Sequence, residues 1–406
     1  SLVGSEMCIR DRPGTGPVGV GPWGITYNPS NGYIYVTAER QGTVYVIDST
    51  INTAIGVIQI GEGYGLRGIA YDPSNGYIYA AVWSDSTVDV IDTANDTVID
   101  EITVGLAPQQ IVYDPSNGYI YVAVWGTDEV SVINGANYTI IHTIYVPTEP
   151  WGIAYDPSNG YLYITASASN TVAVIDPKTN TVIGTIQLGA EGINPHGVAY
   201  DPSNGYIYVA DSGSNTVSVI DPVKYTVIDT IVGVGLSPQQ IAYDPNNGYL
   251  YVTASGSNIV TVIDGKTNTI VGRILVGSQP EGIVYDPSNG YIYVANYGSD
   301  SISVISTTAA STTTTTAPIT STTTAPAATT STTLTSTATA TVTSTITSTV
   351  TTTVTSTTTS TVTSTTPVTL TSTPSTVTVT KPIVSTTTVV STVTVTKPAA
   401  STSLVE

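Results

Sequence analysis

The chain contains 406 residues, and its 29 acidic residues outnumber its 10 basic ones, which gives a formal net charge of −19. A surface this acidic repels phosphate backbones, so the charge excludes nucleic-acid binding through a basic face. No apolar run approaches the length of about 18 residues that a bilayer span requires, and no membrane span is predicted.

Residues 1–12 do not share the composition of the rest of the chain. Their sequence, SLVGSEMCIRDR, is similar to translated sequencing-adapter read-through, and we interpret it as a non-native leader; an ordinary unstructured leader is the alternative. This segment holds the only cysteine, Cys8, and the only methionine, Met7. The remainder therefore has no disulfide, thiol nucleophile or cysteine-based metal site. The segment lacks the apolar core of a signal peptide, so we expect the natural start to lie upstream.

Residues 13–306 contain seven copies of a motif close to Y-D-P-S-N-G-Y-I-Y-V. The copies begin at Tyr27, Tyr71, Tyr113, Tyr155, Tyr200, Tyr243 and Tyr285. Successive copies are thus 42 to 45 residues apart. A period of this size indicates a repeat architecture in which one unit is too small to bury a core of its own.

The fifth copy shows what one unit contains. Four β-rich runs (GVAY, YIYVA, TVSVI and TVIDTIVG) are separated by turn residues, and no segment has a helical period. The turn at Asp201–Gly205 has Pro at its second position and Asn-Gly where a positive φ is favoured, which is a hairpin signal. Four antiparallel strands in each of seven units predict an all-β, seven-bladed β-propeller with four-stranded blades.

The recurring Y-[IL]-Y-[VI]-[AT], followed by T-V-x-V-I-D and T-V-I-x-T-I, resembles the YVTN-type β-propeller repeat. Residues 293–296 (YVAN) come nearest to the motif that gives the family its name. The resemblance covers residues 13–306 and implies a propeller. Members of the family include archaeal surface-layer and cell-surface proteins, and the wider propeller group includes lactonases and lyases. The resemblance is therefore specific for the fold and not for an activity.

The ends of the repeat region predict how the ring closes. The seventh copy has three strand-like runs and then continues into a Thr-rich tail, whereas Pro17–Gly21 resembles residues 231–235, the end of a fourth strand. We expect the N-terminus to supply the outer strand of the seventh blade, because this removes an open sheet edge. Most of that strand would fall in the leader, so we expect poor pairing; a full, well-paired strand before Pro17 would contradict this.

Two sets of positions vary among the copies. Alternate connections of an antiparallel meander share a face, so both sets are expected opposite the D-P-S-N-G turns. The first set begins the innermost strand and consists of Trp23, Arg67, Gln109, Trp151, His196, Gln239 and Glu281. The second follows the second strand and consists of Glu39, Trp83, Trp125, Ser167, Ser212, Ser255 and Tyr297. All four Trp lie in these sets, which predicts a face that binds sugar rings or protein partners, with Trp83 and Trp125 as glycan contacts. The alternative is that the indoles only cover the channel mouth.

Catalysis at this face is the alternative hypothesis. His196, Glu281 and Arg67 would act as base, acid and anion clamp across the channel mouth. The sequence contains no G-x-S-x-G motif. Each D-P-S-N-G turn, such as that of Asp72 or Asp114, offers one carboxylate where a calcium ion requires several oxygen ligands. We expect no metal and no cofactor. We expect His142 to be a half-exposed residue of an outer strand.

Residues 307–406 consist almost entirely of Thr, Ser, Val, Ala and Pro. This composition is typical of a disordered, O-glycosylated stalk, because it offers too few large apolar side chains for a core. The alternative is that T-V-T-V stretches such as residues 376–380 pair as strands. The tract is similar to stalks of archaeal surface proteins, which implies a C-terminal membrane anchor beyond this sequence.

Two glycosylation sequons, at Asn95 and Asn137, fall in turns expected to be exposed. Together with the stalk, they favour an extracellular, cell-surface propeller that serves in surface-layer assembly, adhesion or ligand recognition. The expected partner is a cell-surface protein or glycan.

Overall fold

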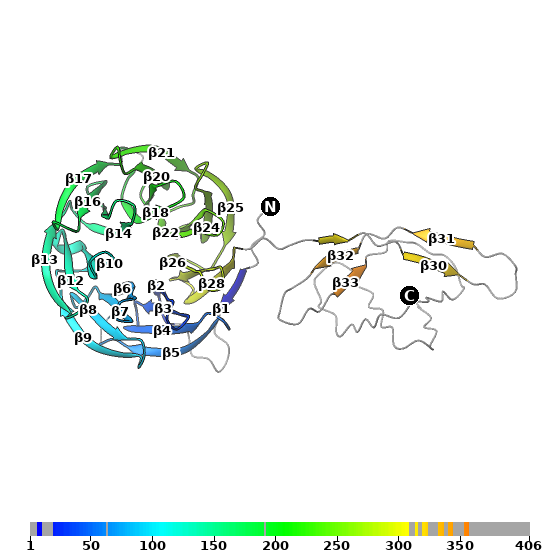
Figure 1. Ribbon diagram of the computed structural model, residues 1–406, viewed down its shortest axis with the longest axis horizontal. Helices are drawn as coiled ribbons and strands as arrows, with labels where there is room; N and C mark the ends of the chain where they lie inside the picture. Colours follow the sequence, from blue (N-terminus) through cyan, green and yellow to red (C-terminus); the bar gives the residue numbers. More distant parts are fainter. Residues whose placement is uncertain are drawn as a thin grey trace. The chain divides into compact units, whose positions relative to one another are not determined.

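The computed structural model describes residues 6–9, 19–61, 64–190 and 192–307, together with five short strands between residues 313 and 356. Seven four-stranded antiparallel sheets follow one another around a ring in the first of two compact units, residues 1–309 (Figure 1). The prediction of a seven-bladed propeller is confirmed. No helix in the described part of the chain is long and apolar enough to cross a membrane.

The first six blades run from the channel outwards in chain order. The first three blades are β2 (Pro22–Asn28), β3 (Tyr33–Ala38), β4 (Thr43–Asp48), β5 (Thr53–Gln59); β6 (Leu66–Asp72), β7 (Tyr77–Val82), β8 (Thr87–Asp92), β9 (Thr97–Thr103); and β10 (Pro108–Asp114), β11 (Tyr119–Val124), β12 (Glu129–Asn134), β13 (Thr139–Tyr145). A 3₁₀ turn, η1 (Trp125–Thr127), follows β11.

The remaining blades repeat the arrangement. They are β14 (Pro150–Asp156), β15 (Tyr161–Ala166), β16 (Thr171–Asp176), β17 (Thr181–Gln187); β18 (Pro195–Asp201), β19 (Tyr206–Asp211), β20 (Thr216–Asp221), β21 (Thr226–Val232); β22 (Pro238–Asp244), β23 (Tyr249–Ala254), β24 (Ile259–Asp264), β25 (Thr269–Leu275); and β26 (Pro280–Asp286), β27 (Tyr291–Asn296), β28 (Ser301–Ser306) with β1 (Glu6–Ile9) as the outer strand.

The core lies between blades. The second strand of every blade contributes one tyrosine whose side chain is completely or almost completely buried, such as Tyr79 and Tyr208. Each apolar cluster combines side chains of two neighbouring blades; Val88 of the second blade and Ile120 of the third belong to one such cluster. A single blade therefore leaves its apolar faces exposed, which explains why the repeat is stable only as a ring.

The D-P-S-N-G turns have a structural role. In the second blade, Oδ1 of Asp72 accepts a hydrogen bond from the Ser74 backbone N–H at 2.8 Å, and Oδ1 of Asn75 accepts one from Tyr77 N–H at 2.9 Å. Gly76 closes the turn with φ +80°, a conformation that favours glycine. The Tyr79 hydroxyl reaches the Gly135 carbonyl of the next blade at 3.2 Å. These contacts account for the near-identity of the copies.

The N-terminus supplies the outer strand of the seventh blade, as predicted. β1 pairs antiparallel with β28 over four residues, from Glu6 opposite Ile305 to Ile9 opposite Ile302. The other six outer strands have seven residues each. The pairing is therefore short, and it is made by the segment that we interpreted as a non-native leader. Pro17 and Val18 lie outside the described residues.

Part of the Thr-rich tract also pairs as strands. β29 (Thr313–Thr315), β32 (Ala340–Thr343) and β33 (Thr353–Ser356) form one small sheet, and β30 (Ile319–Thr323) with β31 (Thr332–Ser336) forms another. The alternative interpretation of the tract expected Thr-rich stretches to pair as strands, and these five segments do so. Residues 376–380 lie outside the described residues.

Candidate functional site

A β-bulge at the start of every innermost strand places the first set of variable residues. In the first blade the register between β2 and β3 shifts between Pro22 and Ile25, so Trp23 and Gly24 have no ladder partner. The same shift occurs in the other six blades. A bulge re-aims the side chain that it contains. The seven variable residues therefore leave the regular pleat beside the channel.

Glycines after five of these residues let neighbouring inner strands approach closely; Gln110 and Gln240 stand at the other two positions. A Cβ added to Gly24 would lie 2.2 Å from the Arg67 carbonyl oxygen, and one on Gly152 would lie 2.2 Å from that of His196. In the first blade the Thr37 hydroxyl accepts a hydrogen bond from Gly24 N–H at 2.7 Å and donates one to the Arg67 carbonyl at 2.8 Å. The backbone of one site residue is thus fixed against that of the next.

One backbone hydrogen bond joins the two variable sets in every blade. The N–H after the second strand donates to the carbonyl two residues before the bulge residue; in the second blade, Trp83 N–H donates to Gly65 at 2.7 Å. The accepting residue has a positive φ in all seven blades: Gly21, Gly65, Ala107, Glu149, Asn194, Ser237 and Gln279. The two sets therefore occupy equivalent positions in the seven blades.

Eight of these variable residues surround one pocket of about 270 Å³. They come from six blades and are Trp23, Glu39, Arg67, Trp151, His196, Gln239, Glu281 and Tyr297. The other six residues of the two sets do not line it, among them Ser167, Ser212 and Ser255. Gln109 is buried, Trp83 is 40% exposed, and Trp125 begins the 3₁₀ turn.

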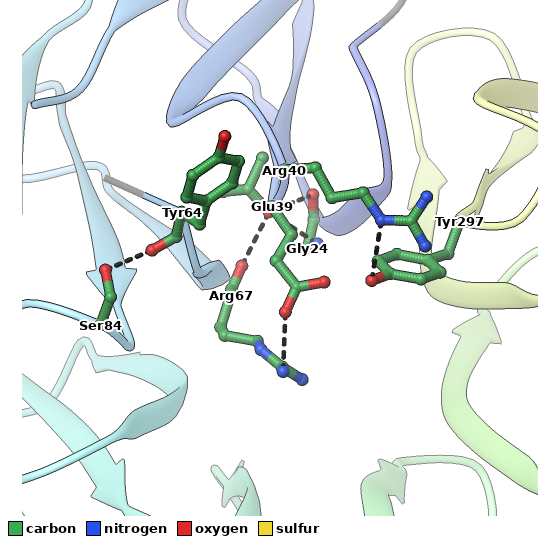
Figure 2. Close-up of polar contacts among 8 residues, drawn as sticks. Gly24, Glu39, Arg40, Tyr64, Arg67, Ser84 and Tyr297 are labelled. Carbon is green, nitrogen blue, oxygen red and sulfur yellow. Dashed lines mark hydrogen bonds and ion pairs between the residues drawn. The ribbon is translucent and has the colours of Figure 1, made fainter. Parts of the chain in front are cut away.

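The guanidinium of Arg67 is held by protein groups on several sides. Its Nη2 lies 2.7 Å from Oε1 of Glu39 (Figure 2). Its Cζ lies 5.2 Å from the ring centroid of Trp23 and 5.9 Å from that of Trp83, within cation–π range. The ion pair and the two indoles fix the positive charge at the pocket. Trp83 therefore supports the site from outside its lining.

Tyr297 is positioned by Arg40, a residue that the sequence did not single out. The Arg40 Nε donates a hydrogen bond to the Tyr297 hydroxyl at 3.2 Å, and the Arg40 Cζ lies 4.3 Å from the ring centroid (Figure 2). Burial raises the pKa of Tyr297. In the sequence, only the position of Arg40 directly after Glu39 indicated that its side chain could lie near the site.

His196 is a neutral, oriented imidazole. Its ring stacks on Trp151 with centroids 4.1 Å apart and planes 7° apart. Its Nδ1 lies 2.6 Å from Oε1 of Gln239, whose Nε2 donates to the Ser255 hydroxyl at 3.1 Å. Because the amide oxygen only accepts, Nδ1 carries the proton and Nε2 holds the lone pair. Burial, with a contribution from the charge of Arg67, lowers the pKa of His196.

Glu281 is the half-buried carboxyl group of the pocket. Burial raises its pKa to about 8; the charge of Glu39 acts in the same direction, and that of Arg67 opposes both. Within the described ranges its carboxyl group has no hydrogen bond or ion pair. The group is therefore mostly protonated at neutral pH and available to a ligand.

The residues described contain no cluster of three or more His, Cys, Asp or Glu side chains arranged to hold a metal ion. His142 lies in β13 opposite Val132, with an exposed side chain, where the sequence predicted a half-exposed one. The sequon residues Asn95 and Asn137 lie in exposed turns.

Comparisons with known proteins support the fold. The family model of the YNCE-like β-propeller matches residues 162–333. Among solved structures, a chain of Kuenenia stuttgartiensis hydrazine synthase matches with a TM-score of 0.64 and 22% sequence identity, covering 71% of this chain and 96% of that one. No curated protein matches. At this identity the likeness shows the fold alone and carries no argument about activity.

Proposed function

We propose that the propeller is a binding module whose ligand occupies the channel-mouth pocket. The observation that carries this proposal is the convergence of eight non-repeated side chains, from six blades, on one pocket. The D-P-S-N-G turns and the second and third strands are copied with few changes, and their residues are explained by turns, strands and the core. Among the positions that differ between copies, these eight are the ones that surround a common pocket.

The lining suits a ligand about the size of one sugar ring or one long side chain. Trp23, Trp151 and Tyr297 provide aromatic surface, and Arg67 and His196 provide oriented polar groups. A few fixed polar groups among aromatic walls are typical of specific small-ligand sites.

We place this module at a cell surface on a glycosylated stalk, in surface-layer assembly or adhesion, with a protein or glycan as partner. The Thr/Ser-rich composition and the two exposed sequons support that setting.

The test is ligand-observed NMR with a panel of monosaccharides, small amines and small carboxylates. Trp151→Ala removes one wall of the pocket, whereas Trp125→Ala removes an indole outside it. We expect at least one compound to bind the wild type and the Trp125→Ala variant and to lose binding to Trp151→Ala. Absence of binding to the wild type, or equal binding to all three proteins, contradicts the proposal.

One observation favours a second candidate, a lactonase- or lyase-type enzyme. The pocket combines a neutral imidazole, His196, with a protonated carboxyl group, Glu281. Catalytic acid–base pairs typically have environments that shift the pKa values of the two groups in opposite directions. This candidate predicts turnover of an ester, lactone or uronate substrate, reduced about 10²- to 10⁴-fold in His196→Ala. A broad substrate screen without turnover excludes it.

A further inference from the structure

We propose that the pocket binds a primary ammonium or guanidinium group and that the Glu281 carboxylate receives it. This deepens the proposed function and rests on it. The ligand would be a small amine or the Lys or Arg side chain of a partner protein; both present the same cationic group on an apolar stem.

The first argument is that Glu281 alone, among the ionisable side chains of the lining, lacks a partner within the described part of the protein. Arg67 and Glu39 form an ion pair. His196 is bound to Gln239, and Tyr297 is bound to Arg40. A desolvated carboxyl group without a partner costs free energy when it ionises, and a ligand that donates charge-assisted hydrogen bonds removes that cost.

The second argument is the chemistry of the walls. Trp23, Trp151 and Tyr297 line the same pocket as Glu281. Aromatic faces attract cations and also pack against a methylene stem. The protein already uses this device, because the guanidinium of Arg67 lies within 5.9 Å of both Trp23 and Trp83. A cation with a short aliphatic stem therefore matches the lining better than a neutral polar group does.

The third argument is the charge. The Glu39–Arg67 pair is neutral as a unit and His196 is uncharged, so an ionised Glu281 gives the pocket a net charge of about −1. Residues 13–306 carry 26 acidic and six basic side chains. This field raises the local concentration of cations and opposes anions.

The proposal requires binding to depend on pH. The charged or titratable groups that face Glu281 are Arg67 of β6, Glu39 after β3, His196 of β18 and Tyr297 after β27. Since the pKa of Glu281 is raised to about 8, the carboxylate population rises from about 3% at pH 6.5 to about 90% at pH 9. Propylamine stays cationic over this range, so its affinity should increase about 30-fold, with release of a proton.

The experiment is isothermal titration calorimetry of the whole chain with propylamine, propan-1-ol and propionate. We expect propylamine to bind at least about tenfold more tightly than the other two. Glu281→Gln should abolish both the preference and the pH dependence, whereas Glu101→Gln, an exposed change on β9, should leave both intact. The pH series on the wild type tests the proposal even if Glu281→Gln does not fold.

Equal binding of propylamine to the wild type and Glu281→Gln, or tighter binding of propionate, overturns the inference. If propylamine fails while another compound binds and depends on Trp151, the cation inference falls and the proposed function stands. If nothing binds, both fall. A capped Gly-Lys-Gly peptide distinguishes the sources: tighter binding than propylamine indicates a partner side chain, and weaker binding indicates a free amine.

Discussion

Gly152→Ala should destabilise the propeller because no space exists for a methyl group between two inner strands. The added Cβ would lie 2.2 Å from the His196 carbonyl oxygen, whereas ordinary contacts begin at 3.4 Å. One strand must therefore move by about 1 Å, and overpacking of this kind costs about 3 kcal/mol. For a domain of this size, that corresponds to a melting temperature lower by about 6 °C.

The displaced strand carries His196, so its stacking on Trp151 should also be disturbed and binding at the pocket weakened. The matched control is Gly56→Ala on the outer strand β5, where the new Cβ would lie 3.5 Å from Val46. That change should be neutral or stabilise by about 0.5 kcal/mol. Thermal unfolding followed by circular dichroism measures both. Equal melting temperatures for Gly152→Ala and the wild type would refute the close-packing argument.

Three further predictions concern charge and ring closure. Arg67→Gln should raise the pKa of Glu281 further above its ordinary value, since Arg67 is the charge that lowers it; an unchanged NMR titration of Glu281 would contradict this. Burial raises the pKa of Asp211 to about 7 and that of Glu281 to about 8, so the folded state holds protons that the unfolded state releases. Their contribution to stability is complete below about pH 4 and is lost as pH rises to about 8. Asp211→Asn should therefore reduce the fall in melting temperature between pH 5 and pH 8. An unchanged fall would contradict the assigned contribution of Asp211. Deleting residues 1–12 exposes the edge of β28, so it should lower the melting temperature and promote self-association in light scattering; an unaffected monomer would show that β1 contributes nothing.

The sequence predicted the fold and the set of candidate site positions, but it did not predict which of these positions line the pocket. Seven copies in register allow equivalent positions to be read directly, so the eight lining residues all belong to the two predicted sets. Whether a residue reaches the pocket depends on its distance from the channel and on its backbone conformation. Trp125, at the start of a 3₁₀ turn, does not reach it, and Gln109 is buried outside it.

Contacts between blades could not be predicted. The Trp151–His196 stack and the Glu39–Arg67 ion pair join residues 45 and 28 positions apart, and their geometry follows from the bulges and from side-chain rotamers. That the N-terminus closes the seventh blade was predicted, but the residues and register of β1 were not, because hydrogen bonds at a sheet edge use backbone groups that every sequence possesses. The composition of residues 1–12 therefore carried no information on which of its residues pair with β28.

The central claim is that the channel-mouth pocket binds the ligand. It is tested most directly by a crystal structure of the protein soaked in turn with propylamine, propionate and a monosaccharide. The account predicts electron density for propylamine within the pocket, with its nitrogen within hydrogen-bond distance of Glu281 and its stem against Trp151. Density for these compounds only elsewhere on the propeller, with the pocket holding water alone, would contradict it.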